Sequence, residues 1–293
     1  MSKVNIDTLC GLFGKSRQAY YQQKNRTYNE VIKEEVILDF VKKQRKIMPR
    51  LGGRKLHHNL LTNLPGNFHL GRDAFFDLLR ENQLLIRRRR YKIKTTDSNH
   101  WLHKYPNLIR EFTPEKPNQL WVSDITYVET EDGFKYLFLI TDAYSRKIIG
   151  WCLADTLEAK HAIKALYMAL WQLPDDVKEI IHHSDRGVQY CSEAYVKILQ
   201  KRGVKISMTE KGDPLENAIA ERINGILKTE WIYDMDPSKV SNSKIKRIIG
   251  TYNTHRPHQS IDMLTPNEAH KVHGILRKHW KNYYKKCKME ANE

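Results

Sequence analysis

ENAIAERINGILKTEW, residues 216–231, has the spacing of an amphipathic helix. Apolar side chains recur every three or four positions from Ile219 to Leu227, which predicts one buried face. A different face of the same helix carries four polar residues: Asn217, Glu221, Asn224 and Lys228. Glu221 and Lys228 are separated by two turns, so they lie about 10 Å apart along one side. A helix of this kind is also typical of a solvated surface, and the residues upstream distinguish the two interpretations.

The charge of the chain indicates an anionic partner. The 293 residues carry a net charge of +16, which is typical of proteins that bind nucleic acid. The charge is segregated, because residues 1–110 contain 23 Lys and Arg against 9 Asp and Glu. Residues 111–273 are nearly neutral, and residues 274–293 are basic again and predict a basic C-terminal tail. The length allows about two domains.

Cysteine usage and hydropathy exclude several protein classes. Cys10, Cys152, Cys191 and Cys287 form no CxxC pair, which argues against a zinc finger and against a disulfide scaffold. Widely spaced cysteines of this kind fit a reducing compartment. The N-terminus lacks the apolar stretch of a secretory signal, and no apolar run approaches the ~20 residues of a membrane span. A cytoplasmic location without membrane association is therefore expected.

The N-terminal third predicts two helical modules. Residues 1–30 predict a first helix-turn-helix-like module, in which Gly14 supplies the turn and Ser16 caps the second helix. Residues 31–86 predict a second such module, broken by MPRLGG and LPGNFHLG. Its last helix, Arg72–Leu84, is the candidate DNA-recognition helix, with Arg72 at its start. A plain helical bundle is the alternative interpretation of this all-α region.

A basic linker is predicted at residues 87–111. It begins with four consecutive arginines and has no long apolar periodicity. The arginines are candidates for contacts to DNA phosphates: Arg87, Arg88, Arg89 and Arg90. A solvated hinge is the alternative for any one of them.

The pattern changes to that of an α/β core over residues 112–273. Three apolar strand candidates joined by short connections predict antiparallel neighbours: Leu120–Glu129, Tyr136–Thr141 and Lys147–Leu153. Helices and strands then alternate, at Leu157–Trp171, Glu179–His183, Glu193–Lys201, Val204–Met208 and Glu216–Trp231. Five strands arranged in this way predict a mixed sheet with helices packed on it.

Three carboxylates occupy informative positions in this pattern. Asp124 lies on the first strand, Asp185 follows the fourth, and Glu221 lies on the late helix. The sequence places 35 residues between Asp185 and Glu221, and Lys228 follows Glu221 on the same face.

With this D…D-35-E…K pattern the chain resembles the DDE transposases and retroviral integrases, and more closely the OrfB-type transposases of the insertion-sequence-three family. Several further segments carry the resemblance: WVSDITYV, TDAYSRKIIGW, HHSDRGVQYCS, ISMTEKGDPLENAIAERINGILKTE, YNTHRPHQSIDMLTPNEA, LCGLFGKSRQAYY and GGRKLHHNL. They cover nearly the whole chain in order. The family commonly has Asp where this chain has Glu216, and Ser where it has Arg222.

The resemblance implies an RNase H-like catalytic core and metal-dependent DNA cleavage and strand transfer. Asp124, Asp185 and Glu221 would be both the catalytic and the metal-binding residues, with Asp124 shared between two Mg²⁺ ions, for which Mn²⁺ can substitute. Lys228 would contact a DNA phosphate near the site.

Other residues compete for these roles. Asp142 ends the second strand and is interpreted as a strand-end cap. Four histidines are interpreted as core or phosphate-contacting groups in preference to zinc ligands: His182, His183, His255 and His258. Four tyrosines are interpreted as packing residues in preference to recombinase nucleophiles: Tyr20, Tyr21, Tyr283 and Tyr284.

The expected partners follow from the resemblance. The DNA would be the terminal inverted repeats of a prokaryotic insertion sequence and the target DNA, both in the nucleoid. An OrfA protein or an OrfA–OrfB fusion, and a homo-oligomer on DNA, are also expected. Two alternatives remain: a non-catalytic DNA-binding regulator of transposition that requires OrfA, and a general RNase H-like nuclease.

Overall fold

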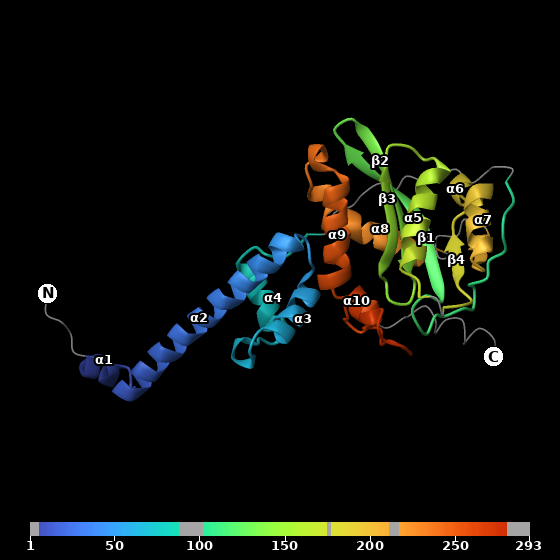
Figure 1. Cartoon of the computed structure of the whole chain (residues 1–293). Coiled ribbons are helices and arrows are strands. Elements are labelled where there is room, and N and C mark those ends of the chain that lie inside the picture. The colour runs from blue at the N-terminus through green and yellow to red at the C-terminus, as the bar shows by residue number, and fades with distance from the viewer. Residues whose placement is uncertain (1–5, 88–101, 175–176, 211–216, 280–293) are drawn as a thin grey trace, which may run out of the picture. The chain divides into compact units, whose positions relative to one another are not determined.

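The computed structural model describes residues 6–87, 102–174, 177–210 and 217–279. The chain forms two compact units, residues 1–87 and 88–293, each of which is described by itself (Figure 1). Within the described residues, no helix has the length and apolar character needed to cross a membrane.

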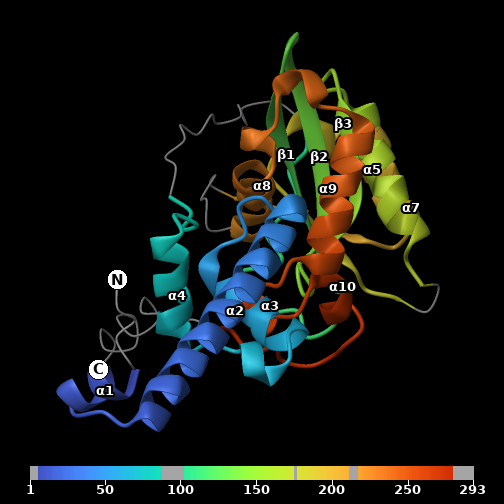
Figure 2. The same cartoon turned by 90° about the vertical axis from the view of Figure 1, so that its left-hand side faces the viewer.

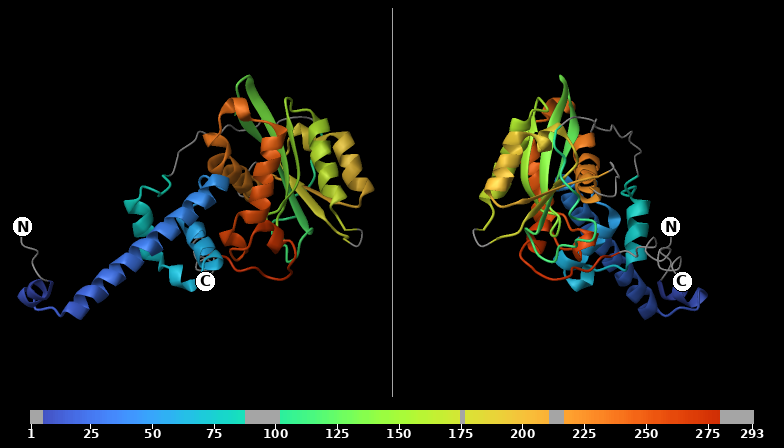
Figure 3. Two further views of the ribbon diagram at one scale, coloured as in Figure 1. Left: turned by 60° about the vertical axis from the view of Figure 1, so that its left-hand side comes forward. Right: turned by 90° about the vertical axis from the view of Figure 1, so that its right-hand side faces the viewer.

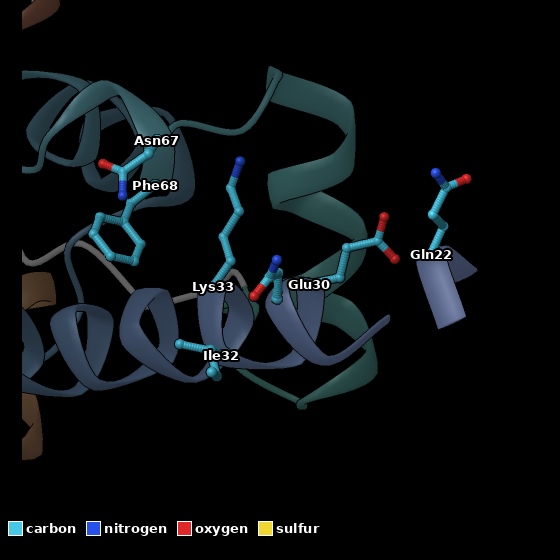
Figure 4. Close-up of a pocket in the computed structure, with 7 residues that line it drawn as sticks. Gln22, Glu30, Ile32, Lys33, Asn67 and Phe68 are labelled. Carbon is cyan, nitrogen blue, oxygen red and sulfur yellow. The ribbon is translucent and has the colours of Figure 1, made fainter. Parts of the chain in front are cut away.

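The N-terminal unit is all-helical. It consists of α1 (Ile6–Leu12), α2 (Arg17–Ile47), α3 (Gly53–Asn63), the 3₁₀ turn η1 (Gly66–Phe68) and α4 (Arg72–Glu81). Its core is formed by side chains with no exposed surface from α2, α3 and α4: Ile37, Val41, Leu56, Leu60, Phe75 and Leu79. A pocket between α2 and η1 (Figure 4) is lined by residues of mixed character: Gln22, Asn29, Glu30, Ile32, Lys33, Asn67 and Phe68. Glu30 is the one acidic residue in that lining, so the pocket is not a cluster of carboxylates.

The predicted boundary between residues 30 and 31 is wrong. A single helix, α2, runs from Arg17 to Ile47 and contains both the second helix of the first predicted module and the first helix of the second. The segment KNRTYNE at 24–30 contains neither Gly nor Pro, so no residue there ends the helix. The predicted N-cap is confirmed, since the Ser16 hydroxyl accepts a hydrogen bond from the Ala19 amide at 3.1 Å.

The second unit is built on a five-stranded mixed sheet, as predicted. The strands are β1 (Leu120–Thr130), β2 (Gly133–Asp142), β3 (Ile148–Ala154), β4 (Ile181–Ser184) and β5 (Lys205–Met208), in the order β3-β2-β1-β4-β5. The first three strands pair antiparallel, and β4 and β5 run parallel to β1. Three meandering strands followed by two crossovers give the RNase H-like arrangement.

Helices cover both faces of this sheet (Figures 1 and 3). One face packs against α5 (Ala159–Trp171), the short α6 (Val188–Cys191) and α7 (Glu193–Lys201) around a large apolar core. The other face bears α8 (Ala218–Glu230) and α9 (Asn242–His255), as Figure 2 also shows. A smaller apolar cluster there joins α8 to β1, to β4 and to the residue that follows β2: Leu120, Val122, Ala143, Ile181 and Ala220.

The chain continues beyond α8 in short elements. These are η2 (Ile232–Asp234), η3 (Pro237–Lys239), η4 (Gln259–Ile261) and α10 (Pro266–Ala269). Thr265 and Glu268 form a capping box that begins α10.

The predicted core boundaries at residues 112 and 273 are too narrow. Met208 of the edge strand β5 donates its amide to Pro106, and Leu102 and Tyr105 pack against the large core. The segment LHKYPNLIR, residues 102–110, contains apolar residues interspersed with basic ones. These apolar residues cover the edge of the sheet, so this part of the predicted linker belongs to the core. At the other end, the amide of Gly274 donates to the carbonyl of Glu115 at 2.7 Å.

Candidate active site

Two of the three predicted carboxylates lie on neighbouring parallel strands, Asp124 within β1 and Asp185 directly after β4. Ser123 of β1 pairs with Ser184 of β4. Asp124 and Asp185 are the residues that come directly after this pair in the sequence. Side chains alternate along a strand, so Asp124 shares the α8 face of the sheet with Val122. The Asp185 carboxylate accepts the Gly187 amide at 3.0 Å, which holds it in the turn after β4.

Glu221 reaches the same face from α8. It lies in the first turn of the helix and is exposed, while Ala220 packs against the apolar cluster beneath. Two buried asparagines fasten the helix to β1. Asn217 donates to the carbonyl of Ser123 at 3.1 Å, and Asn224 donates to the Asp124 carboxylate at 2.7 Å. The polar face of the helix is thus directed partly at the sheet and not only at solvent.

The charges of the three carboxylates act on one another. Burial and then the negative charge of Asp185 raise the pKa of Asp124 to about 7, and Glu221 adds to this. Hydrogen bonds from Asn224 and from the Ile125 amide oppose the increase in that pKa. Partial burial, followed by the charge of Asp185, also raises the pKa of Glu221. The structure therefore brings Asp124, Asp185 and Glu221 within electrostatic reach of one another.

Lys228 is half-buried on the same helix. Burial lowers the pKa of its ammonium group, and the negative charge of Asp124 acts in the opposite direction. The cation is therefore close enough to Asp124 to respond to its charge. This places Lys228 beside the acidic group, two turns along α8 from Glu221.

The donor set suits a hard divalent cation. Three carboxylates supply oxygen ligands, and their mutual repulsion is the kind that a bound cation relieves. The oxygens of Asn217 and Asn224 are buried without a hydrogen-bond partner beside β1, so the site also holds unused acceptors. Over the described ranges, however, no three His, Cys, Asp or Glu side chains converge closely enough to enclose an ion. The oxygen atoms of the three carboxylates therefore fit a hard divalent cation chemically. Glu221 is the most exposed of the three residues.

The competing residues have structural partners. The buried Asp142 carboxylate accepts the amides of Asn118 and Ser145 at 2.7 Å, which confirms its interpretation as a strand-end cap. Each of the four histidines lies within hydrogen-bonding distance of a side chain, and the pairs are His182–Ser123, His183–Ser207, His255–Thr254 and His258–Arg256. Tyr20 and Tyr21 pack edge to face, and Tyr283 and Tyr284 lie outside the described residues.

A buried ion pair fixes the far end of α8. The Arg256 guanidinium donates two hydrogen bonds to the Glu230 carboxylate, at 2.6 and 2.7 Å. Arg256 is 1% exposed, and it also contacts His258 and the Tyr252 ring. The RPH segment after α9 thereby anchors the helix that carries Glu221.

The predicted DNA contacts outside the core are only partly described. Arg72 is the first residue of α4, exposed and paired with Asp73 at 2.9 Å. Arg87 is exposed, and its carbonyl oxygen accepts a hydrogen bond from Arg50. Arg88, Arg89 and Arg90 lie outside the described residues.

The spacing of the polar residues marks Asn217 and Asn224 on the same face of the helix as Glu221 and Lys228, but it does not predict that their side chains donate hydrogen bonds to β1. Ser123, His182 and Tyr195 come together only in space, so no sequence pattern marked them.

Known proteins resemble this chain over the same region. Residues 114–214 and 202–266 match two families that are both described as integrase core domain. A 31 kDa protein of insertion element IS600 from Shigella sonnei is 35% identical over 265 residues, which are 88% of this chain and 96% of that protein. Transposase InsF for insertion sequence IS3A from Escherichia coli is 39% identical over 135 residues, which are 46% of each protein.

The solved structures include the HTLV-2 integrase catalytic core domain in complex with magnesium. It is similar with a TM-score of 0.44 and 18% identity, over 54% of this chain and 99% of that chain.

Proposed function

Because this chain belongs to the insertion-sequence transposases with an integrase core domain, we propose that it cleaves the ends of its own element and joins them to target DNA. The observation that carries this proposal is the mutual electrostatic coupling of Asp124, Asp185 and Glu221, which three separate elements bring to one face of the sheet.

The three carboxylates would hold two Mg²⁺ ions, for which Mn²⁺ could substitute. Bound there, the ions would activate the attacking oxygen and stabilise the leaving oxygen of an in-line displacement at phosphorus. Asp124 has the central part, since both other carboxylates act on its pKa. Asn224 keeps one Asp124 oxygen oriented, and Gly187 does the same for Asp185.

The proposed reaction has two displacements of the same kind. Water attacks the phosphodiester at the element end and frees a 3′-hydroxyl. That hydroxyl then attacks a phosphodiester of the target, and the target strand leaves with its own 3′-oxygen. Neither displacement requires a covalent bond to the protein. Lys228, whose pKa responds to the charge of Asp124, would neutralise a phosphate of the bound strand.

The partners in this proposal are DNA and further protein chains. The exposed Arg72 and the arginines from Arg87 to Arg90 would contribute phosphate contacts. Joining two element ends calls for at least two protomers, and an OrfA protein or an OrfA–OrfB fusion would supply recognition of the ends. The reaction would take place on the DNA of a prokaryotic cytoplasm.

The test uses labelled DNA that flanks the gene, incubated with the full chain and Mg²⁺ or Mn²⁺. Glu221→Gln should abolish joined products while binding of the DNA persists. Glu193→Gln is the matched control, since Glu193 also lies in the first turn of a helix and is exposed. It should leave the joined products unchanged.

Other outcomes would identify the alternatives. Equal binding without cutting in both the native protein and Glu221→Gln would favour a regulator, or a protein that lacks its OrfA partner. Adding OrfA separates these two, because it restores joining only in the second case. Cleavage of RNA–DNA hybrids without any joining would favour a general nuclease.

A further inference from the structure

A buried polar triangle lies behind the two aspartates. The His182 Nε2 atom is 2.7 Å from the Ser123 hydroxyl and 2.9 Å from the Tyr195 hydroxyl. All three residues are at most 1% exposed, and they lie in the large apolar core next to Tyr190. Ser123 directly precedes Asp124 on β1, His182 is on β4 three residues before Asp185, and Tyr195 is on α7.

The triangle occupies the face of the sheet opposite the carboxylates. Ser123 and Asp124 are neighbours on a strand, so their side chains point to opposite faces. Burial, reinforced by the charge of His183, lowers the pKa of His182 to about 3, so the imidazole is neutral near neutral pH. The three groups therefore form neutral hydrogen bonds within the core and do not reach DNA.

Apolar packing alone specifies the β1–β4 register poorly. The two strands share four rungs, from Leu120–Ile181 to Ser123–Ser184, and every residue of these rungs is buried. Alternation between a buried and a solvated face normally fixes register, because a slip by one residue would expose the apolar set. Where both faces of a strand are buried, as in β1 and β4, a slip by one residue exposes no apolar side chains to solvent and carries no such penalty.

A slip would separate the catalytic aspartates. One residue along a strand is about 3.3 Å, and a displacement of about 1 Å in a catalytic group can cost ~100-fold in rate. Directional hydrogen bonds between the strands specify one register, whereas apolar groups of the same shape would be about as stable without specifying it.

We propose that Ser123, His182 and Tyr195 are positioning residues that lock the β1–β4 register and thereby hold Asp124 beside Asp185. This inference rests on the proposed function, since it concerns the spacing of the carboxylates that would share the cations. Asn217 extends the lock to α8, because it donates to the carbonyl of Ser123.

The test compares Ser123→Ala with Ser207→Ala in the full chain. Ser207 is the control, since its buried hydroxyl lies 2.8 Å from His183, accepts the Leu108 amide at 2.9 Å, and joins β4 to β5 instead of β1 to β4. Mn²⁺ binding measured by calorimetry should weaken on the order of 10-fold in Ser123→Ala. The same constant should stay within about twofold in Ser207→Ala. Hydrogen exchange should accelerate at residues 120–124 and 181–185 only in Ser123→Ala.

A second variant keeps the inference testable if Ser123→Ala does not fold. Tyr195→Phe keeps the ring and the Ser123–His182 bond, so it should give a smaller loss of Mn²⁺ affinity at nearly native thermal stability. Equal Mn²⁺ affinity in the native protein and in Tyr195→Phe or Ser123→Ala would overturn the inference, as would equal losses in Ser123→Ala and Ser207→Ala. A native protein that binds no Mn²⁺ would instead refute the proposed function, and the inference with it.

Discussion

Replacing Asp124 by Asn should stabilise the metal-free protein at alkaline pH. The Asp124 carboxyl has an ordinary pKa of 3.8 and titrates at about 7 when folded. The unfolded chain releases this proton first, so between these two pKa values the folded state binds more protons and its stability falls as pH rises. At 1.36 kcal/mol per pH unit, the decrease over the whole interval is about 4 kcal/mol.

Asn cannot ionise and avoids this cost. Its side-chain oxygen can still accept the hydrogen bond from Asn224, but its NH₂ group cannot accept the Ile125 amide, which costs about 1 kcal/mol. Asp124→Asn should therefore be about 3 kcal/mol more stable than the native protein at pH 8. Below pH 3.8 it should be no more stable.

Urea unfolding in EDTA, followed by tryptophan fluorescence at a series of pH values, measures the difference. All six tryptophans lie between residues 101 and 280, so the signal reports the unit that contains Asp124. Added Mg²⁺ should stabilise the native protein and narrow the gap to the variant. Asp155→Asn is the control, because Lys135 lowers the pKa of this exposed carboxyl and any effect has the opposite sign. A stability difference between Asp124→Asn and the native protein that does not grow from pH 4 to pH 8 would refute the reasoning.

Three further substitutions test other parts of the core. Arg256→Met removes the guanidinium from the largely buried Glu230 carboxylate, so urea unfolding should show a loss of about 3–5 kcal/mol, most of it recovered when Glu230 is also replaced by Met. Gly150→Ala drives a methyl group into the carbonyl oxygen of Ala165 in α5, and thermal unfolding should show a loss of about 1–3 kcal/mol or more. Asn224→Ala removes the donor to Asp124, and Mn²⁺ titration should show affinity reduced about 10- to 100-fold with little change in stability.

Much of the core is predictable from local sequence patterns. The bounds of β1, α5, α7 and α8 differ from the predicted ones by no more than two residues, since buried and polar positions alternate with the period of each element. The spacing around Glu221 selected one glutamate on α8 as the third carboxylate, and the structure brings it within electrostatic reach of Asp185.

Other features depend on residues distant in the sequence. The Arg256–Glu230 pair and the Ser123–His182 contact join residues 26 and 59 positions apart, and nothing local marks such partners. The predicted break near residue 30 was wrong for a different reason. The composition of KNRTYNE is polar, which is typical of a loop, but no residue in it disfavours helix strongly enough to end α2.

The two faces of β1 carry side chains with different roles. Asp124 faces α8, where it interacts with the other charged groups of the site and with Asn224. Ser123 faces the opposite core, where water is excluded and hydrogen bonds are correspondingly directional. A substitution behind the sheet can therefore reach the carboxylates only through the backbone of β1 and β4. Such a substitution should change how well cations are held without altering which residues hold them.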